Sequence, residues 1–443
     1  MKSKTIIALS LTLIVTILVP NIAHGTKTLS FTNIALIRPD GNSEPELSIS
    51  QNGQVALVGL SWTLFQTNAW EGAFGTTPVF QGAIDSMIKN GVGGGEDADV
   101  DFGSTGTIHV TTLLAVFNPN TKITQLGVSA ITCPNGDLSN NFSNCTRQII
   151  DFTQADRPWI TSDGPHVWIS YHDSGSSTTI HVWRSDDDGF TWKTVSDPIT
   201  GQAGVTGNST FNNDQGKIVA DPVTHNVYAV YAAGISGVQK GTTANFNNIY
   251  VSTSTDLGAD WTPHLVFTAT VNQPLNNVFP VLALDPLSGT LYASWSNLHN
   301  VFVSKSTNQG STWSSPVAVA NSPVNTALEP WVAVRSQTVD VTYYGTSSSS
   351  NTDPTAVWNT YLSQSTDGGS HFVQSVVSAH PNHIGEICTG GVSCTQGTRN
   401  LLDLFQVAID PLNGLAAVIF TDDTLTTQSN GSPLPQVIVA YQT

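Results

Sequence analysis

A short sequence pattern occurs four times in the second half of the chain and constrains the fold more than any other feature. Each copy reads S-x-(D/N)-x-G-x-x-(W/F), and successive copies start 69, 52 and 59 residues apart. The copies occupy residues 185–192, 254–261, 306–313 and 365–372. Ser and Asp oxygens can accept backbone N–H groups and Gly can adopt positive φ, so each copy predicts a hairpin turn. Repetition at this period indicates stacked supersecondary units.

At these four motifs the chain resembles the Asp-box (BNR) repeat superfamily of β-propellers, which includes sialidases, xyloglucan-cleaving propellers and sortilin-type receptors. The resemblance implies an all-β propeller whose motifs lie on the outer hairpins, away from the face that binds ligands. It implies no single function, because catalytic and non-catalytic members share the motif.

A second repeat, an apolar strand followed by a turn and another strand, runs through the whole chain. Continuous apolar runs such as residues 280–286 and 405–411 are typical of inner strands buried on both faces. Seven units are found, at residues 45–62, 97–116, 158–173, 216–233, 280–297, 330–345 and 405–423. We therefore expect one propeller of four-stranded blades over residues 26–443, with seven blades favoured and six as the alternative.

The two ends of the propeller are expected to pair. The last unit supplies only three strands, whereas the strand predicted at residues 28–37 has no partners of its own. We expect this N-terminal strand to complete the final blade and so remove an exposed sheet edge. Residues 76–90 are interpreted as an insertion, with a short helix at residues 83–89.

Residues 1–25 are predicted to be a signal peptide, because Lys2 and Lys4 precede an apolar run and a stretch of small residues. The alternative is an uncleaved N-terminal anchor. No other segment is apolar enough to cross a membrane, so the chain is not expected to be an integral membrane protein after cleavage. We expect a secreted or cell-surface protein, and a monomer.

The charge balance limits the classes of partner. Acidic residues number 32 against 15 basic ones, which gives a formal net charge of −17. Such a surface repels nucleic acid and anionic lipid but accepts cations and neutral glycans. Nucleic acid is therefore excluded as a partner.

The four cysteines form two close pairs, Cys133 with Cys145 and Cys388 with Cys394. In an exported chain this spacing predicts two local disulfides. A zinc site is the alternative, but no CxxC or HxxxH spacing supports it.

The residues just before each inner strand are expected to ring the mouth of the central channel, where a ligand meets several blades. Alignment of the units places Glu44, Arg157, Phe279 and Glu329 at one ring position. Asp156, Asp214 and Asp403 lie one residue earlier. We expect the acidic mouth to bind the ligand. Trp159 and Trp331 offer either core packing, which is favoured, or a flat face to a sugar.

A sialidase would need three arginines that converge on a substrate carboxylate, together with a Tyr–Glu nucleophile pair. Arg38, Arg157 and Arg399 are the candidates, with Glu329 or Glu44, and Tyr343 or Tyr344 as the nucleophile. The alternative interpretation, which is favoured, is that each arginine neutralises a neighbouring carboxylate. In other glycosidases two carboxyl groups act as general acid and base.

Two further clusters suggest metal ligands. Asp97, Asp99 and Asp101 alternate along one strand and would share a face, where calcium would relieve their repulsion. A solvated loop is the slightly favoured alternative, and no cofactor is required. His380 and His383, with Glu386 nearby, are interpreted as part of a surface loop.

Three functions remain open from the sequence. The first is a secreted, sialidase-like propeller that recognises glycans or other extracellular ligands at the acidic channel mouth. The second is a glycoside hydrolase, in the extreme case an exo-sialidase, that uses the arginines and a Glu/Tyr pair. The third is a structural cell-surface interaction module.

Overall fold

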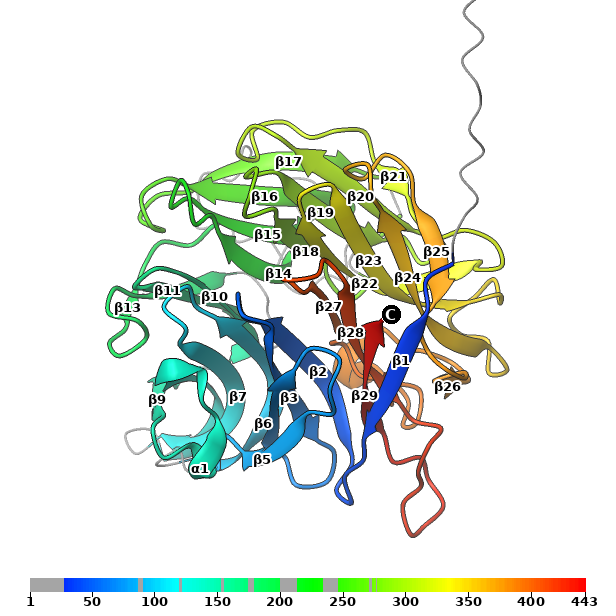
Figure 1. Ribbon diagram of the computed structural model, residues 1–443, viewed down its shortest axis with the longest axis horizontal. Helices are drawn as coiled ribbons and strands as arrows, with labels where there is room; N and C mark the ends of the chain where they lie inside the picture. The colour runs from blue at the N-terminus through cyan, green and yellow to red at the C-terminus, as the bar shows by residue number, and fades with distance from the viewer. Residues whose placement is uncertain are drawn as a thin grey trace, which may run out of the picture.

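Seven antiparallel sheets surround a central axis in the structure, which is a computed structural model (Figure 1). The described residues are 28–86, 91–118, 122–152, 155–173, 179–199, 213–233, 246–270, 273–275 and 277–443. The predicted signal peptide lies outside them. The predicted all-β propeller with seven four-stranded blades is confirmed, and we number the blades one to seven in the chain order of their inner strands.

Each blade follows the same path, from an inner strand beside the channel outward to a fourth strand at the rim. The inner strands are β2 (Asn42–Ile49), β6 (Gly91–Phe102), β10 (Ala155–Asp163), β14 (Asn213–Ala220), β18 (Val281–Leu284), β22 (Thr326–Arg335) and β27 (Gln406–Ile409). The second strands are β3 (Gln54–Ser61), β7 (Ile108–Asn118), β11 (His166–Asp173), β15 (Val227–Ala233), β19 (Leu291–Ser296), β23 (Thr338–Thr346) and β28 (Ala416–Asp422).

The outer half of each blade is less uniform than the inner half. The third strands are β4 (Thr67–Ala73), β8 (Ile123–Cys133), β12 (Ile180–Ser185), β16 (Asn248–Ser254), β20 (Val301–Ser306), β24 (Val357–Ser365) and β29 (Gln436–Gln442). The fourth strands are β5 (Val79–Ala83), β9 (Thr146–Asp151), β13 (Lys193–Thr194), β17 (Thr262–Thr268), β21 (Val317–Ala318), β25 (Val373–Val376) and β1 (Phe31–Leu36). A short strand, β26 (His383–Ile384), also pairs with β24.

The ring closes through the N-terminal strand, as predicted. β1 pairs antiparallel with β29, from Phe31 opposite Gln442 to Leu36 opposite Val437. Figure 1 shows this strand in blue beside the red C-terminal strand. The seventh blade therefore combines both ends of the described chain, and β1 covers the edge of β29 that would otherwise be unpaired.

The blades are held together by apolar side chains packed between neighbouring sheets. At the seam, Val55 and Leu57 of blade one pack with Ile419 and Val439 of blade seven, and all four are fully buried. Burial of each such side chain contributes about 1.5–3 kcal/mol.

The four repeated motifs form the predicted hairpin turns between third and fourth strands. In the turn after β20, Ser306 Oγ donates to Asn308 Oδ1 at 2.9 Å and accepts the Gly310 N–H at 3.0 Å. The Thr312 N–H donates to Asn308 Oδ1 at 3.0 Å. The other three turns repeat this bonding. Since the strands alternate in direction, these turns lie at the opposite end of the blades from the start of the inner strands.

Both predicted disulfides are present, Cys133–Cys145 and Cys388–Cys394. The first closes the connection from β8 to β9, which contains a 3-10 turn (Pro134–Gly136) and the short helix α1 (Ser139–Phe142). The second closes a loop between blades six and seven that contains another 3-10 turn (Gly391–Ser393). Among the described residues no helix is long and apolar enough to cross a membrane.

The predicted insertion at residues 76–90 is wrong. This segment supplies β5, the fourth strand of blade one, which pairs with β4. The helix expected at residues 83–89 is not formed over its described part, because Ala83 ends the strand and a turn follows. Residues 87–90 lie outside the described part.

Candidate functional site

A repeated bulge at the start of the inner strands positions the charged side chains of the mouth. In five blades the register with the second strand shifts at the same place. The bulged residues are Glu44, Asp97, Arg157, Gly216 and Glu329. A bulge leaves one residue unpaired and redirects its side chain. Pro follows the bulged residue in three blades, where the missing N–H costs no ladder hydrogen bond.

The backbone at these bulges is held in the left-handed region. The φ angles are 47° at Glu44, 27° at Asp97, 51° at Arg157 and 51° at Glu329. Left-handed φ for a residue other than Gly costs of order 1–3 kcal/mol and persists only where the surroundings enforce it. Four blades thus accept local strain at the same ring position, and each gains a charged side chain there.

Asp403, which precedes the inner strand of blade seven, is the centre of the ion-pair network. Its carboxylate accepts from Arg399 at 2.6 Å and 3.1 Å, and from Arg157 at 3.2 Å. Arg157 also pairs with Asp214 at 2.5 Å. The network therefore joins three blades through two guanidinium groups and two carboxylates.

Glu44 and Asp97 extend this network. The Asp403 N–H donates to Glu44 Oε1 at 3.0 Å, and the Arg157 N–H donates to Asp97 Oδ2 at 3.2 Å. Burial, together with the charge of nearby Glu44, raises the pKa of Asp97. Since burial raises the pKa of Glu44 as well, this pair of carboxyl groups can hold a proton at neutral pH.

Glu329 differs from the other mouth residues because neither of its carboxyl oxygens has a hydrogen-bond partner among the described residues. Its side chain is only 5% exposed. Burial, together with nearby Asp403, raises the pKa of Glu329 well above its usual range. A buried polar group of this kind calls for an explanation, because native proteins satisfy nearly all of them.

Burial and charge act differently on the other acids. Burial and the neighbouring Asp403 raise the pKa of Glu44 to about 7. Burial raises the pKa of Asp97 well above its usual range and that of Asp214 to about 6. Burial also opposes the charge of Asp403, but Arg399 and Arg157 outweigh it and lower the pKa of Asp403. At neutral pH the mouth therefore combines ionised and protonated carboxyl groups.

A second charged layer lies further along the same strands and contains Lys217 and Glu46, which were not among the candidates from the sequence, together with Asp99, which was. Lys217 Nζ pairs with Asp99 Oδ1 at 2.6 Å. Nearby Glu46 is fully buried, and its carboxyl oxygens have no hydrogen-bond partner in the described part of the chain. Their positions in the sequence could have identified both residues. Glu46 follows the bulged residue Glu44 by two positions, and Lys217 directly follows the bulged residue Gly216.

Aromatic side chains fill the channel beside this layer. Trp159 is fully buried and Trp331 is 4% exposed. The Trp159 ring lies 5.6 Å from that of Trp331 and 5.1 Å from that of Phe279. Both indole rings are buried and pack against another aromatic ring. Phe279, which the alignment placed at the ring position, is buried, but the ladder of its blade begins at Val281 and has no register shift.

The three candidate sialidase arginines do not converge. Arg157 and Arg399 meet at Asp403, whereas Arg38 pairs with Asp40 at 3.3 Å and lies over the Phe80 ring at 3.7 Å. Phe80 belongs to the outer strand of blade one. Arg38 follows the outer strand β1 rather than leading directly into the mouth, so it is separated from the other two.

The two tyrosines proposed as nucleophiles are both buried. Tyr343 donates to Gln374 at 2.7 Å, on the outer strand of its blade. Tyr344 stacks on Phe405, and burial together with nearby Glu329 raises its pKa well above the usual range. A raised pKa disfavours the phenolate that nucleophilic attack requires.

Asp97, Asp99 and Asp101 share a strand face that is turned toward blade three. Asp99 accepts the Ile160 N–H at 2.8 Å and Asp101 accepts the Ser162 hydroxyl at 2.6 Å. Backbone and hydroxyl donors of β10 therefore bind the carboxylates that were considered calcium ligands. The described residues contain no group of three or more His, Cys, Asp or Glu side chains that could hold a metal ion.

The segment with His380 and His383 is more tightly held than the expected surface loop. His383 is buried in β26 and pairs with Asp423 at 2.9 Å, while His380 pairs with Asp422 at 2.9 Å. The expectation of a surface loop is wrong for His383.

Asp156, from the predicted rim, lies 3.8 Å from buried His172 and is the most exposed of the rim acids.

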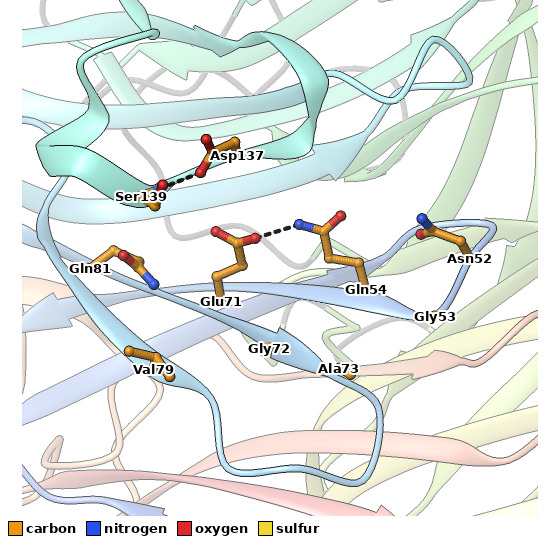
Figure 2. Close-up of a pocket in the computed structure, with 10 residues that line it drawn as sticks. All are labelled: Asn52, Gly53, Gln54, Glu71, Gly72, Ala73, Val79, Gln81, Asp137 and Ser139. Carbon is orange, nitrogen blue, oxygen red and sulfur yellow. Dashed lines mark hydrogen bonds between the residues drawn. The ribbon is translucent and has the colours of Figure 1, made fainter.

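A separate groove of about 510 Å³ lies between blades one and two, away from the mouth. Figure 2 shows Gln54 and Glu71 facing each other, with Asp137 and Ser139 on the opposite wall. Glu71 also accepts the Leu138 N–H at 3.0 Å and so holds the first disulfide loop in place. Because the groove is also lined by polar side chains, a variant in the groove serves as a control for ligand binding at the mouth.

No protein-family model matches the chain, and no curated protein matches it. Among solved structures it is similar to a polysaccharide lyase of family PL25, an ulvan lyase bound to -[GlcA(1-4)Rha3S]-. The identity is 10% and the TM-score 0.54, over 92% of this chain and 95% of that chain. It is also similar to a protein of unknown function from Dyadobacter fermentans. In that case the identity is 11% and the TM-score 0.50, over 93% and 98% of the two chains. At identities this low, the similarity shows the fold alone. In this chain the fold is an all-β propeller with seven four-stranded blades.

Proposed function

We propose that this chain is a secreted propeller that binds a glycan at the channel mouth formed by its bulged inner strands. One observation carries the proposal: Glu329, held by a left-handed backbone, presents two buried carboxyl oxygens without a described hydrogen-bond partner. Carboxyl oxygens are good acceptors for sugar hydroxyl groups. A bound ligand would supply the donors that the protein itself does not.

The energetics of the mouth support a binding role. Strained backbone and unsatisfied buried groups both lower stability, and they cluster where binding or catalysis requires them. Here both occur together at Glu329, and the same strain recurs at Glu44 and Arg157. If these positions served only to pack the core, an apolar residue at each of them would give a more stable protein.

Two further observations support an extracellular glycan ligand. The two disulfides fit an oxidising compartment. The similar PL25 lyase is described as bound to an oligosaccharide. Asp156 and Asp214 would place additional acceptors at the outer edge of the mouth.

Hydrolysis of a glycosidic bond is the second candidate. The pKa of Glu44 is raised to about 7 by burial and Asp403, so this carboxyl can hold a proton at neutral pH and act as a general acid. Ionised Asp403 would stabilise positive charge at the sugar. The exo-sialidase version is disfavoured, because Arg38 lies apart from Arg157 and Arg399.

The test is a glycan array probed with the full secreted chain, purified from culture medium. Glu329→Gln should lower binding of the best glycan by tenfold or more. Gln81→Ala, which alters the groove of Figure 2, should leave binding unchanged. Release of reducing sugar from the bound glycan, lost in Glu44→Gln, would identify a hydrolase. Binding that depends on Gln81 and not on Glu329 would refute the assignment to the mouth.

A further inference from the structure

We propose that the mouth selects a glycan that carries a positive charge, namely an amino sugar with a free ammonium group. This inference rests on the proposed function and narrows its ligand class. It follows from the balance of charge at Glu329 and its neighbours, from the lack of donors around Glu329, and from the geometry of the acids.

The first step is the charge balance. Five buried or half-buried carboxyl groups, Glu44, Asp97, Asp214, Glu329 and Asp403, meet only two guanidinium groups in the described part of the mouth. Both guanidinium groups are already engaged. Arg399 binds Asp403, and Arg157 bridges Asp403 and Asp214. No described cation therefore remains for Glu329.

The buried carboxyl group of Glu329 needs hydrogen-bond partners that the described residues do not supply. A proton removes the charge, but it leaves one buried donor and one buried acceptor without partners. Each unsatisfied buried polar group is unfavourable. A group that donates several hydrogen bonds and carries positive charge would satisfy both needs at once, and an ammonium group has three donors.

The third step separates an ammonium from a metal ion. A hard cation such as calcium needs six to eight oxygen ligands at short distance. The described residues contain no group of three acids or histidines arranged to hold a metal ion. An ammonium group at the end of a sugar ring needs only hydrogen-bonding distance to two or three acceptors, and the sugar hydroxyl groups can bind the remaining ones.

The second charged layer contains another buried carboxyl group without described hydrogen-bond partners. Glu46 lies beside Glu44 and Asp99, and Lys217 is the one described cation that affects its pKa. A ligand rich in donors that reached this layer would find further acceptors without described partners.

The experiment compares two oligosaccharides that differ in N-acetylation, which replaces each ammonium group by a neutral amide. Titration calorimetry at pH 6 would use the full secreted chain with a tetramer of glucosamine and with the N-acetylated tetramer. The free amine should bind at least tenfold more tightly. Glu329→Gln should bring the two affinities within about twofold, and the thermal midpoint of this variant would verify that it folds. Gln81→Ala should retain the wild-type preference.

The outcomes separate this inference from the proposed function. Equal binding of both tetramers, or preference for the N-acetylated one, would overturn the inference while leaving glycan binding intact. If neither tetramer binds and no glycan on the array binds, both proposals fall. Calcium binding that is lost in Glu329→Gln would overturn the inference in favour of a metal site.

Discussion

The buried proton at Glu44 leads to a specific prediction about stability and pH. Burial and Asp403 raise the pKa of Glu44 from 4.5 to about 7. Because the folded-state pKa is the higher one, the folded protein binds this proton more tightly than the unfolded chain. The resulting stabilisation is complete below about pH 4.5 and is lost as the pH rises through about 7. Glu44→Gln should remove this loss, since Gln mimics the protonated acid.

The size of the effect follows from the two pKa values. Their separation corresponds to roughly 3 kcal/mol of folding free energy. A chain of 443 residues has an unfolding entropy of roughly 0.9 kcal/mol/K near its midpoint. The thermal midpoint should therefore change by about 3 °C. Gln keeps the acceptor for the Asp403 N–H and has nearly the same volume, so it should fit without repacking.

The assay is scanning calorimetry of wild type and Glu44→Gln from pH 4.5 to pH 8. The midpoints should coincide at pH 4.5, and that of the variant should be about 3 °C higher at pH 8. Glu386→Gln, a carboxyl outside the mouth network, serves as the control and should follow the wild-type profile. Parallel profiles for wild type and Glu44→Gln would refute the buried proton at Glu44.

Three further predictions concern the network, the turns and the metal question. Asp403→Asn removes a buried charge that pairs with two arginines. It should lower the free energy of unfolding by about 3–5 kcal/mol and the thermal midpoint by about 3–5 °C. An unchanged midpoint would contradict the central role of Asp403 in the network. Gly310→Ala places a Cβ 2.9 Å from Thr253 Oγ1 of the neighbouring blade, whereas Gly431→Ala has no neighbour within 4 Å; the two positions have similar φ angles, +81° and +84°. In chemical denaturation, Gly310→Ala should therefore lose more unfolding free energy than Gly431→Ala. Equal losses would show that the inter-blade contact does not contribute. Millimolar calcium should not raise the midpoint, because β10 donors bind Asp97, Asp99 and Asp101; an increase that a chelator reverses would establish a calcium site.

The blade architecture could be predicted because its signals are local. Inner strands such as β18 and β27 have no exposed position and appear as largely apolar runs followed by Asp-Pro. The repeated turns place Ser, Asp or Asn, and Gly at fixed offsets. Closure through β1 followed from counting three strands in the last unit.

The outer strand of blade one could not be predicted in the same way. β5 is only five residues long, includes Gly82, and has no fully buried position. Since an outer strand contacts one neighbour and much solvent, it needs no regular apolar pattern. The segment was therefore interpreted as an insertion.

The site was predicted where a local signal marked the bulge. Pro after Glu44, Arg157, Phe279 and Glu329 aligned four blades at the ring position. All of these except Phe279 occupy the bulge. Asp97 occupies the same bulge without a following Pro, so it was assigned to a metal cluster instead. The pairing of Lys217 with Asp99 joins strands 118 residues apart in sequence, and no local pattern reports such proximity. Arg38 was misplaced because closeness in sequence to β2 does not bring its side chain to the mouth.

A crystal structure of the protein with the glucosamine tetramer tests the central claim most directly. The sugar should lie over the channel mouth, with its ammonium group within hydrogen-bonding distance of Glu329. A tetramer bound in the groove beside Gln81, or a Glu329 carboxyl turned away from the channel, would contradict it.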